Sequence, residues 1–167
     1  MLDQSVFTET IHEVAEIIRT SATPLSKEEI LSYFKEMELN EQQENMVDCY
    51  LDNGRMYILD DNGVKSECVI TGERNGVLEI KNIATVPEHQ GKGYAKALID
   101  FIIEKYSGQY AVLQVGTGDS PLTIPFYEKC GFVRSHIIPN FFTDNYDHPI
   151  YEGGVQLVDM VYLQRKF

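Results

Sequence analysis

The sequence of 167 residues is short of positive charge, of cysteine and of long hydrophobic runs. Lysine and arginine number 14 against 26 aspartate and glutamate residues, which gives a net charge of −12. This balance argues against a nucleic-acid partner, because phosphate contacts need a basic surface. No apolar run reaches the length of a membrane span, and the N-terminus lacks the basic and apolar segments of a signal peptide. We therefore expect a soluble protein with neither nucleic acid nor membrane as a partner.

Metal-ligand spacing is also missing. The three cysteines, Cys49, Cys68 and Cys130, are odd in number and far apart, and the four histidines form no ligand pattern. Reduced thiols are the rule in the cytosol, whereas disulfides belong to oxidising compartments. The sequence therefore predicts a cytoplasmic protein without a metal site. The acidic balance either suits a cationic substrate such as an amine or only keeps the protein soluble.

The first part of the chain has helical spacing of its apolar residues. Capping patterns and i, i+3, i+4 spacing predict helices over about residues 8–19, from about residue 27, and from about residue 40 to 51. The only strand signal here is a short one over residues 5–7. We therefore expect residues 1–54 to be a mostly helical part of one domain that spans residues 1–167.

The pattern then changes to short strands. Asn62-Gly63 is a strong hairpin signal between strands expected at 55–60 and 65–71, since it supplies the positive φ angles of a tight turn. A third strand over 77–86 completes an antiparallel meander. The further elements expected are a helix at 93–106, a strand at 110–115, a short helix at 122–130, a strand at 132–138, a loop at 139–154 and a strand at 155–163. Strand, helix and strand in this order predict a right-handed crossover and a parallel neighbour for the third strand.

Residues 90–95, with the sequence QGKGYA, form a glycine-rich turn between a strand and a helix. Such a turn gathers backbone N–H groups and the positive end of a helix at one point, where phosphate binds well. A dinucleotide fingerprint is excluded, because the third glycine is missing and the turn follows a meander. A P-loop is excluded as well, because no Gly-Lys-Ser/Thr follows.

Together with a second motif, this turn resembles the GCN5-related N-acetyltransferases. Gln90, Gly93 and Ala95 occupy the defined positions of the family's Q/R-x-x-G-x-G/A turn, and residues 124–132, IPFYEKCGF, resemble its F-Y-x-x-x-G-F segment. The resemblance covers residues 55–167 and is most specific over residues 78–132. It implies an α/β fold with a mixed, mostly antiparallel sheet, flanked by helices and splayed at one strand pair to admit acetyl-CoA.

The resemblance also implies how the co-substrate is held. Glycines in the turn let backbone approach the pyrophosphate closely, while the end of the third strand pairs with the pantetheine arm and the Val86 N–H polarises the thioester carbonyl. Lys92 either adds a charge or is a solvated turn lysine. Ser120 stands where the family often has asparagine, and it can still bond the pantetheine arm. The expected co-substrate residues are Ala84, Thr85, Val86, Gln90, Gly91, Lys92, Gly93, Tyr94, Ala95 and Ser120.

Two residues are candidates for proton transfer. Tyr127, in the FY segment, is the implied general acid that protonates the leaving thiolate. Glu79 stands alone in an apolar strand, between Leu78 and Ile80, and the resemblance implies a general base there that takes the proton of the attacking amine. The alternatives are a half-buried core tyrosine and a glutamate on a solvated face, in which case water would take the proton.

The function that the resemblance implies is acetyl transfer from acetyl-CoA to a primary amine of a small molecule or peptide, by direct attack in a ternary complex. Two alternatives remain: a non-catalytic acyl-CoA-binding or regulatory module, and a protein lysine or N-terminal acetyltransferase. The family usually begins with a strand, which here is either vestigial or remodelled. The aromatic and acidic loop at residues 140–151 is either a lid for an organic cation or a packed loop at the sheet edge or in a homodimer contact.

Overall fold

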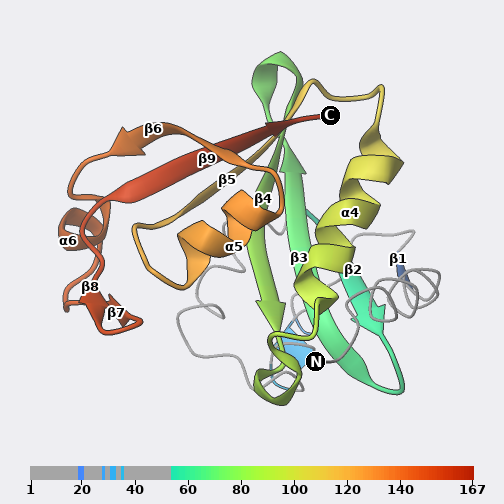
Figure 1. Cartoon of the computed structure of the whole chain (residues 1–167), viewed down its shortest axis with the longest axis horizontal. Coiled ribbons are helices and arrows are strands. Elements are labelled where there is room, and N and C mark those ends of the chain that lie inside the picture. Colours follow the sequence, from blue (N-terminus) through green and yellow to red (C-terminus); the bar gives the residue numbers. More distant parts are fainter. Residues whose placement is uncertain (1–18, 21–27, 29–30, 33–34, 36–53) are drawn as a thin grey trace. The chain divides into compact units, whose positions relative to one another are not determined.

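A computed structural model of the chain describes residues 19–20, 28, 31–32, 35 and 54–167 (Figure 1). The chain divides into two compact units, each made from two stretches of sequence. Unit 1 is Met1–Gly72 with Ile80–Ser107, and unit 2 is Glu73–Glu79 with Gly108–Phe167. Strand β4, Val77–Thr85, passes from unit 2 into unit 1 after Glu79. That the chain forms a single domain stays a prediction.

Unit 1 contains an antiparallel set of strands. Strand β1, Arg19–Thr20, pairs with β2, Gly54–Asp60, and β2 pairs with β3, Val64–Gly72. The predicted turn between β2 and β3 is confirmed, because Asn62 has φ 54° and Gly63 has φ 108°. Only glycine and asparagine adopt such angles readily. The hairpin is therefore set by two residues that can be read in the sequence.

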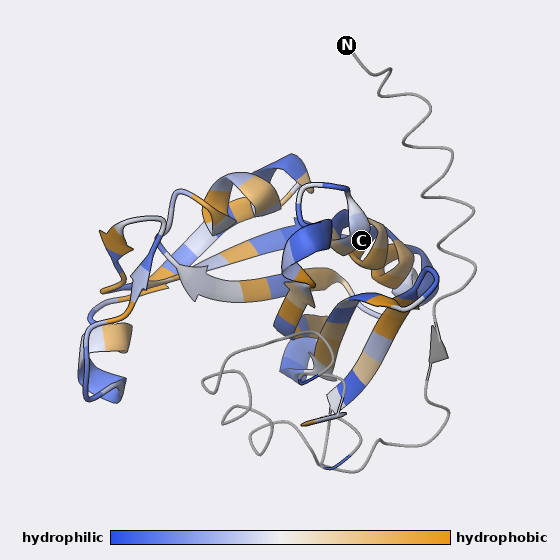
Figure 2. Ribbon diagram, turned by 90° about the horizontal axis from the view of Figure 1, so that it is seen from below, coloured by the Kyte–Doolittle hydropathy of each residue, from blue (hydrophilic) through white to orange (hydrophobic). Residues whose placement is uncertain are grey.

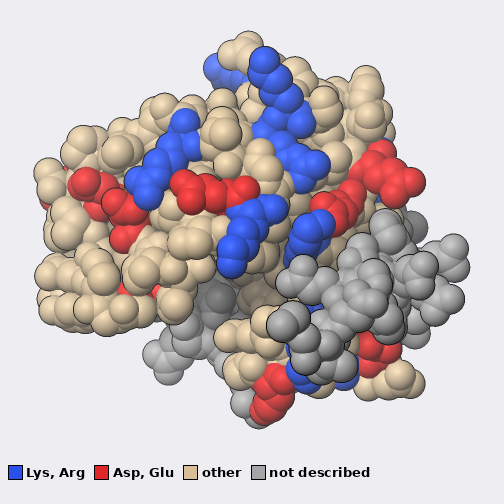
Figure 3. Space-filling model, viewed as in Figure 1, with Lys and Arg blue, Asp and Glu red and all other residues tan. Residues whose placement is uncertain are grey.

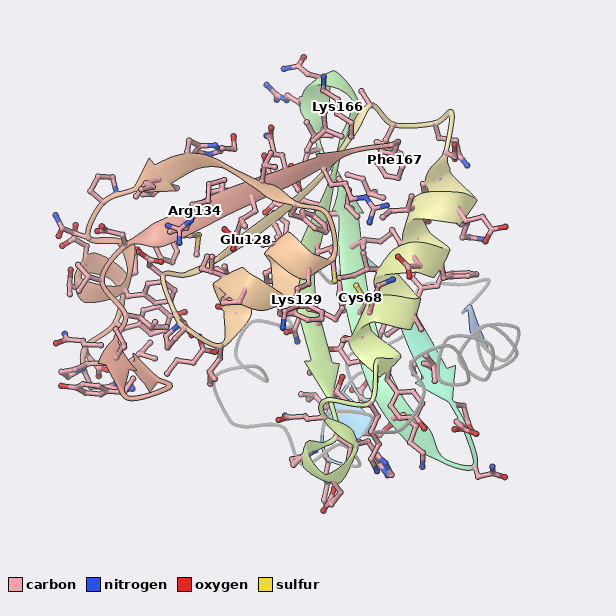
Figure 4. All side chains as sticks on the ribbon, in the orientation of Figure 1. Cys68, Glu128, Lys129, Arg134, Lys166 and Phe167 are labelled. Atoms are coloured by element: carbon pink, nitrogen blue, oxygen red, sulfur yellow. The ribbon has the colours of Figure 1, made fainter. Side chains whose placement is uncertain are left out.

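Helix α4, Tyr94–Tyr106, packs on one face of this hairpin. Tyr57 is the cross-strand partner of Cys68, and its ring meets those of Phe101 and Tyr106 edge-on, with centroids 5.5 Å and 6.4 Å apart. Cys68 of β3, labelled in Figure 4, lies on the same face of the sheet as its partner Tyr57. Figure 2 shows the hydrophobic residues of the strands and of α4 that build this core. The buried residues of α4 are Ala97, Leu98, Ile99, Ile102 and Tyr106.

A tyrosine pair closes the end of this interface. The Tyr57 and Tyr106 hydroxyls lie 2.6 Å apart, and the Arg55 guanidinium donates to the Tyr106 hydroxyl at 3.2 Å. Burial, followed by the hydrogen bond with Tyr106, raises the pKa of Tyr57. The Tyr57 phenol is therefore a structural group that stays protonated at neutral pH.

Unit 2 contains the start of β4 and then β5, Val112–Gly118, β9, Met160–Lys166, and β6, Val133–Ile138, in that spatial order. Strand β9 pairs antiparallel with both β5 and β6. The Ala111 N–H donates to the Gly76 carbonyl, and the Gln114 side chain reaches Glu79, so contacts advance along β4 and β5 in the same direction. The two strands therefore run parallel, as the predicted crossover requires.

Two glycines allow β5 to pack closely against its neighbours. A Cβ added at Gly118 would meet the Leu157 side chain at 2.7 Å, and one at Gly116 would meet Met160 and Tyr162 at 3.0 Å. A larger residue at either position would displace these side chains. Helix α5, Thr123–Lys129, follows β5.

Several predicted elements are confirmed and others are wrong. The loop predicted at 139–154 contains helix α6, Phe141–Asn145, and strand β7, Tyr151–Glu152, which pairs with β8, Val155–Gln156. The last strand is Met160–Lys166 rather than 155–163, because residues 155–156 belong to that separate hairpin. Strand β5 also starts later and ends later than predicted. Tertiary pairing, which no local pattern contains, decides these boundaries.

The N-terminal part was predicted to be helical. Residues 28, 31–32 and 35 are helical, as expected for the second helix. Arg19–Thr20 forms strand β1 and pairs with Tyr57 and Ile58, so the predicted absence of a strand here, apart from 5–7, is wrong. The first helix was predicted to extend to Arg19, which lies in β1 instead. The other predictions for this part lie outside the described residues: the strand over 5–7, the rest of the helix over 8–19, the helix over 40–51 and the thiol at Cys49.

The surface carries both signs of charge. Figure 3 shows lysine and arginine side chains beside aspartate and glutamate side chains on one face of the molecule, so neither sign covers that face. Among the described residues, no helix is long and apolar enough to cross a membrane. Within that same part of the chain, no three histidine, cysteine or acidic side chains cluster as metal ligands would.

Candidate active site

The glycine-rich turn lies in unit 1, directly before helix α4. Strand β4 ends at Thr85, a 3₁₀ turn covers Pro87–His89, and Gly91 and Gly93 then take φ angles of 73° and 91°. These left-handed angles require glycine. A Cβ at Gly91 would meet nothing within 4 Å, so its backbone conformation, rather than crowding within the described chain, makes glycine necessary there.

The N–H groups of this turn differ in availability. The Gln90 N–H donates to the Pro87 carbonyl at 3.3 Å, and the Gln90 side chain donates to the Thr85 carbonyl at 3.4 Å. Gln90 thus braces the turn against the strand end. The first N–H groups of a helix have no partner within the helix; in α4 these are the N–H groups of Tyr94, Ala95 and Lys96, since that of Ala97 already donates to the Gly93 carbonyl.

Tyr94, the first residue of α4, ties the turn to the β2–β3 hairpin. Its hydroxyl donates to an Asp61 carboxylate oxygen at 2.8 Å, and its ring lies 6.0 Å from that of His89. Burial, and then the bond to Asp61, raises the pKa of Tyr94. The Lys92 ammonium lies 3.3 Å from His89 Nδ1 on an exposed surface. Tyr94 therefore positions the turn, while Lys92 and His89 stand at its edge.

The strand end next to the turn is fixed by β3. The Ser66 hydroxyl lies 2.6 Å from the Ala84 carbonyl, to which it donates, and 3.0 Å from the Thr85 hydroxyl. The Val86 N–H donates to the Lys65 carbonyl at 2.9 Å. This N–H was expected to polarise the thioester, but in this structure it is engaged in the sheet. Because N–H groups alternate in direction along a strand, the Thr85 N–H points away from β3.

The two residues expected to transfer protons both lie in unit 2. Tyr127, on α5, is 5% exposed, and its ring packs against those of Phe126 and Phe132 at centroid distances of 5.1 Å and 5.7 Å. The Phe132 N–H donates to the Tyr127 carbonyl at 3.1 Å, which anchors the turn after α5. The FY segment thus holds one buried phenol in an aromatic setting.

Glu79 is the end of a chain of side-chain amides. Its carboxylate accepts a hydrogen bond from Gln114 Nε2 at 2.9 Å, and Gln114 Oε1 accepts one from Gln164 Nε2 at 2.7 Å. The residue is 8% exposed. A solvated face, one of the two alternatives for this residue, is therefore excluded.

Ser120 is buried and accepts hydrogen bonds from nearby backbone N–H groups. Its hydroxyl accepts the Leu122 N–H at 3.0 Å, and its carbonyl accepts the Ile124 N–H at 3.3 Å. These bonds shape the entry to α5. Of the expected residues, the structure therefore gathers Ala84–Val86 and Gln90–Ala95 in unit 1, and Glu79, Ser120 and Tyr127 in unit 2.

One acidic residue was not predicted from the sequence as part of the site. Glu67 lies in the middle of β3 and is 0% exposed, and among the residues that the structure describes neither of its carboxylate oxygens has a hydrogen-bond partner. Part of the signal that pointed to Glu79 is present here, because Glu67 is the only acidic residue of its strand. Burial raises the pKa of Glu67 from its usual 4.5 to about 8.

Comparison with known proteins identifies the family of the chain. The model of the acetyltransferase (GNAT) domain matches residues 52–134. The uncharacterized N-acetyltransferase YvbK of Bacillus subtilis is 35% identical over 128 residues, which are 75% of this chain and 83% of that protein.

Solved structures share the fold. The IAA acetyltransferase of Bacillus cereus superposes with a TM-score of 0.77 at 30% identity, over 90% of this chain and 98% of the other. A GNAT acetyltransferase of Elizabethkingia anophelis with acetyl-CoA bound gives 0.76 at 30% identity, over 90% and 97%. The predicted α/β fold, with a mostly antiparallel sheet flanked by helices, is confirmed. The chain belongs to the GCN5-related N-acetyltransferase (GNAT) family and is an N-acetyltransferase.

Proposed function

We propose that this protein transfers the acetyl group of acetyl-CoA to a primary amine by direct attack in a ternary complex. The observation that carries the proposal is the turn at Gly91–Gly93, where two left-handed glycines precede the N-terminus of α4 and follow the end of β4. Backbone donors and the helix dipole then favour a pyrophosphate at this point. A relative of the same fold has acetyl-CoA bound, which supports the choice of co-substrate.

The Thr85 N–H is the proposed donor to the thioester carbonyl, in place of Val86. Two facts support Thr85: the Val86 N–H is bonded to Lys65, and the Ala84 carbonyl is bonded to Ser66, so both face β3. A donor that already points away from the sheet partner costs no rearrangement when charge develops on the carbonyl oxygen. The Ser66 contacts keep this strand end rigid.

Proton transfer is assigned to side chains of the FY segment and of β4. Tyr127 is the proposed acid for the coenzyme thiolate, and its aromatic packing would hold the phenol in one orientation. Glu79, or a water molecule, is the acceptor of the amine proton that the resemblance implies. A cationic amine also suits the net charge of −12. Cys68 and Cys130 are not in disulfide bonds, which supports a cytoplasmic location.

Calorimetric titration with acetyl-CoA and with CoA tests the coenzyme part of the proposal. Gly91→Ala should weaken coenzyme binding at least about tenfold, because a left-handed angle costs an L-residue about 1–2 kcal/mol and displaces the N–H groups. Gly108→Ala is the matched control: Gly108 has φ 79° and open space around its Cβ, as Gly91 does, but it lies after α4. The control should lose similar stability and keep its affinity. No heat of binding by the wild-type protein would refute the proposal.

An amine panel, with release of the CoA thiol and mass spectrometry of the product as readouts, tests the acceptor. The proposal requires an amide product that carries the acetyl group. Coenzyme binding without acetylation of any small amine, peptide N-terminus or lysine peptide would instead favour a non-catalytic acyl-CoA-binding module.

A further inference from the structure

Glu67 is the only acidic residue of strand β3. Its side chain is 0% exposed, and neither carboxylate oxygen has a partner in the part of the chain that the structure describes. A buried polar group without a hydrogen bond costs about 1–3 kcal/mol, and a charged one costs more. A well-packed apolar residue at this position would avoid that cost. The position therefore calls for a group that donates to the carboxylate.

The register of β3 places Glu67 on a defined face of the sheet. Its cross-strand partner in β2 is Ile58, whereas the next pair, Tyr57 with Cys68, faces α4. Side chains alternate along strands, so Glu67 points to the face opposite α4. On this face of the β2–β3 pair its described neighbours are apolar, since Met56 pairs with Val69.

Glu67 also lies next to the strand end that is proposed to hold the thioester. The preceding residue, Ser66, contacts the Ala84 carbonyl and the Thr85 hydroxyl. Neighbouring strands are about 4.8 Å apart, so the Glu67 backbone is one strand spacing away from this part of β4. Residues 81–86, at the end of β4, are half-buried, so a substrate held along this stretch would lie one strand away from Glu67. All of these residues belong to unit 1.

We propose that Glu67 receives the acceptor amine, holding its ammonium group and taking its first proton. The inference rests on the proposed function, and it replaces Glu79 as the base. Glu79 already accepts a hydrogen bond from Gln114, whereas the oxygens of Glu67 are unbonded in the described chain. An ammonium supplies the missing donors, so the acceptor class is an amine that arrives as a cation.

The proton and electron balance of the step is closed. The ammonium gives one proton to the Glu67 carboxylate, and the nitrogen lone pair forms the C–N bond with the acetyl carbonyl carbon. The C–S bond then breaks, and the coenzyme thiolate takes the second nitrogen proton. Glu67 returns its proton to solvent. A base whose pKa lies near the working pH is the most effective one, and burial brings that of Glu67 to about 8.

The test compares two nucleophiles on the variant Glu67→Gln, which keeps the shape of the side chain. One is an alkylamine, protonated at neutral pH, and the other is an O-alkylhydroxylamine of the same size, which is neutral there and needs no base. With the alkylamine, kcat/KM should fall about 100-fold or more, as expected for loss of a general base. With the O-alkylhydroxylamine it should fall less than about tenfold, and the coenzyme Kd should not change. Ile58→Val, which trims the cross-strand partner, controls for a loosened sheet and should affect both nucleophiles equally.

Each result decides between named possibilities. Equal loss with both nucleophiles, or no loss, overturns the assignment of Glu67. If Glu79→Gln instead shows the selective loss, then Glu79 is the base. If the wild type does not turn over the O-alkylhydroxylamine, the second measurement is the Kd of the alkylamine for the CoA complex of each protein. A Kd that is unchanged in Glu67→Gln overturns the proposal, and binding that is tenfold weaker supports it. Failure of acetyl-CoA binding by the wild type, in contrast, refutes the proposed function itself.

Discussion

Glu67 in β3 and Glu79 in β4 are each the only acidic residue of a strand, but they differ in whether a described hydrogen-bond donor lies beside the carboxyl group. Glu79 ends a chain of amides, Gln164 to Gln114 to Glu79, so a side-chain donor is bonded to its carboxyl group. Glu67 has no such partner in the described chain. The difference teaches that a buried acid with built-in donors belongs to the packing, whereas one without them is open to a ligand. Three changes test this contrast.

The largest expected effect is on the pH dependence of stability. The pKa of Glu67 is raised from 4.5 to about 8 in the folded chain, so between these values the folded protein binds one more proton than the unfolded one. The contribution of Glu67 to the free energy of unfolding should therefore fall by up to about 1.4 kcal/mol per pH unit from about pH 5 to pH 8. It should level off above pH 8.

Urea unfolding of the wild type and of Glu67→Gln, at pH 5 and at pH 8, measures this contribution as a difference between the two proteins. Glu67→Leu should be more stable than the wild type at pH 8, since an apolar side chain has no charge to bury. If the free energy of unfolding changes with pH in the same way in the wild type and in Glu67→Gln, then Glu67 is paired in solution. The contrast with Glu79 would then disappear.

A smaller effect concerns Tyr127, a third buried titratable group, which shares unit 2 with Glu79. Tyr127→Phe should lower kcat about 100-fold, because the leaving thiolate loses its acid, while the coenzyme Kd stays the same. The ring contacts with Phe126 and Phe132 survive the substitution, so stability should change little. Steady-state kinetics with calorimetry separates the two quantities, and an unchanged kcat would remove Tyr127 from the mechanism.

The smallest expected effect is the cost of removing Glu79. Glu79→Leu leaves the Gln114 amide without its acceptor in a partly buried position, which should cost about 1–3 kcal/mol of stability. The matched change Glu67→Leu leaves no described donor unpaired and should carry no such cost. Urea unfolding at pH 8 compares them. Equal losses for the two variants would show that both acids are packed alike.

Much of the fold could be read from local signals. Asn62-Gly63 predicted its hairpin, and the residues of the turn at 90–95 predicted the entry to α4, because positive φ angles restrict the residue type. Strand β1, the hairpin of β7 and β8, and the true start of β9 could not be read in this way. Their residues carry no period of their own, and they are strands only because a partner strand lies beside them.

The candidate site likewise has residues that local motifs predict and features that depend on strand pairing. The residues of the turn and of the FY segment were predictable, since both motifs constrain local backbone and composition. The hydrogen bond from Val86 to Lys65, which removes that N–H from the expected role, depends on strand pairing. Glu67 was visible as a lone acid in β3, yet its importance depends on the absence of a nearby donor in the described chain.

The family motifs, the glycine-rich turn and Glu79 as a lone acid in its strand could be read from the sequence, because these are properties of residue type and spacing. Only the tertiary structure decided which glutamate is satisfied and which is not. Gln114 lies in β5 and Gln164 in β9, far from Glu79 along the chain, and the parallel and antiparallel pairings bring their amides together. Hydrogen bonds reach only about 3 Å, so the chemical state of a buried acid follows from which strand folds beside it.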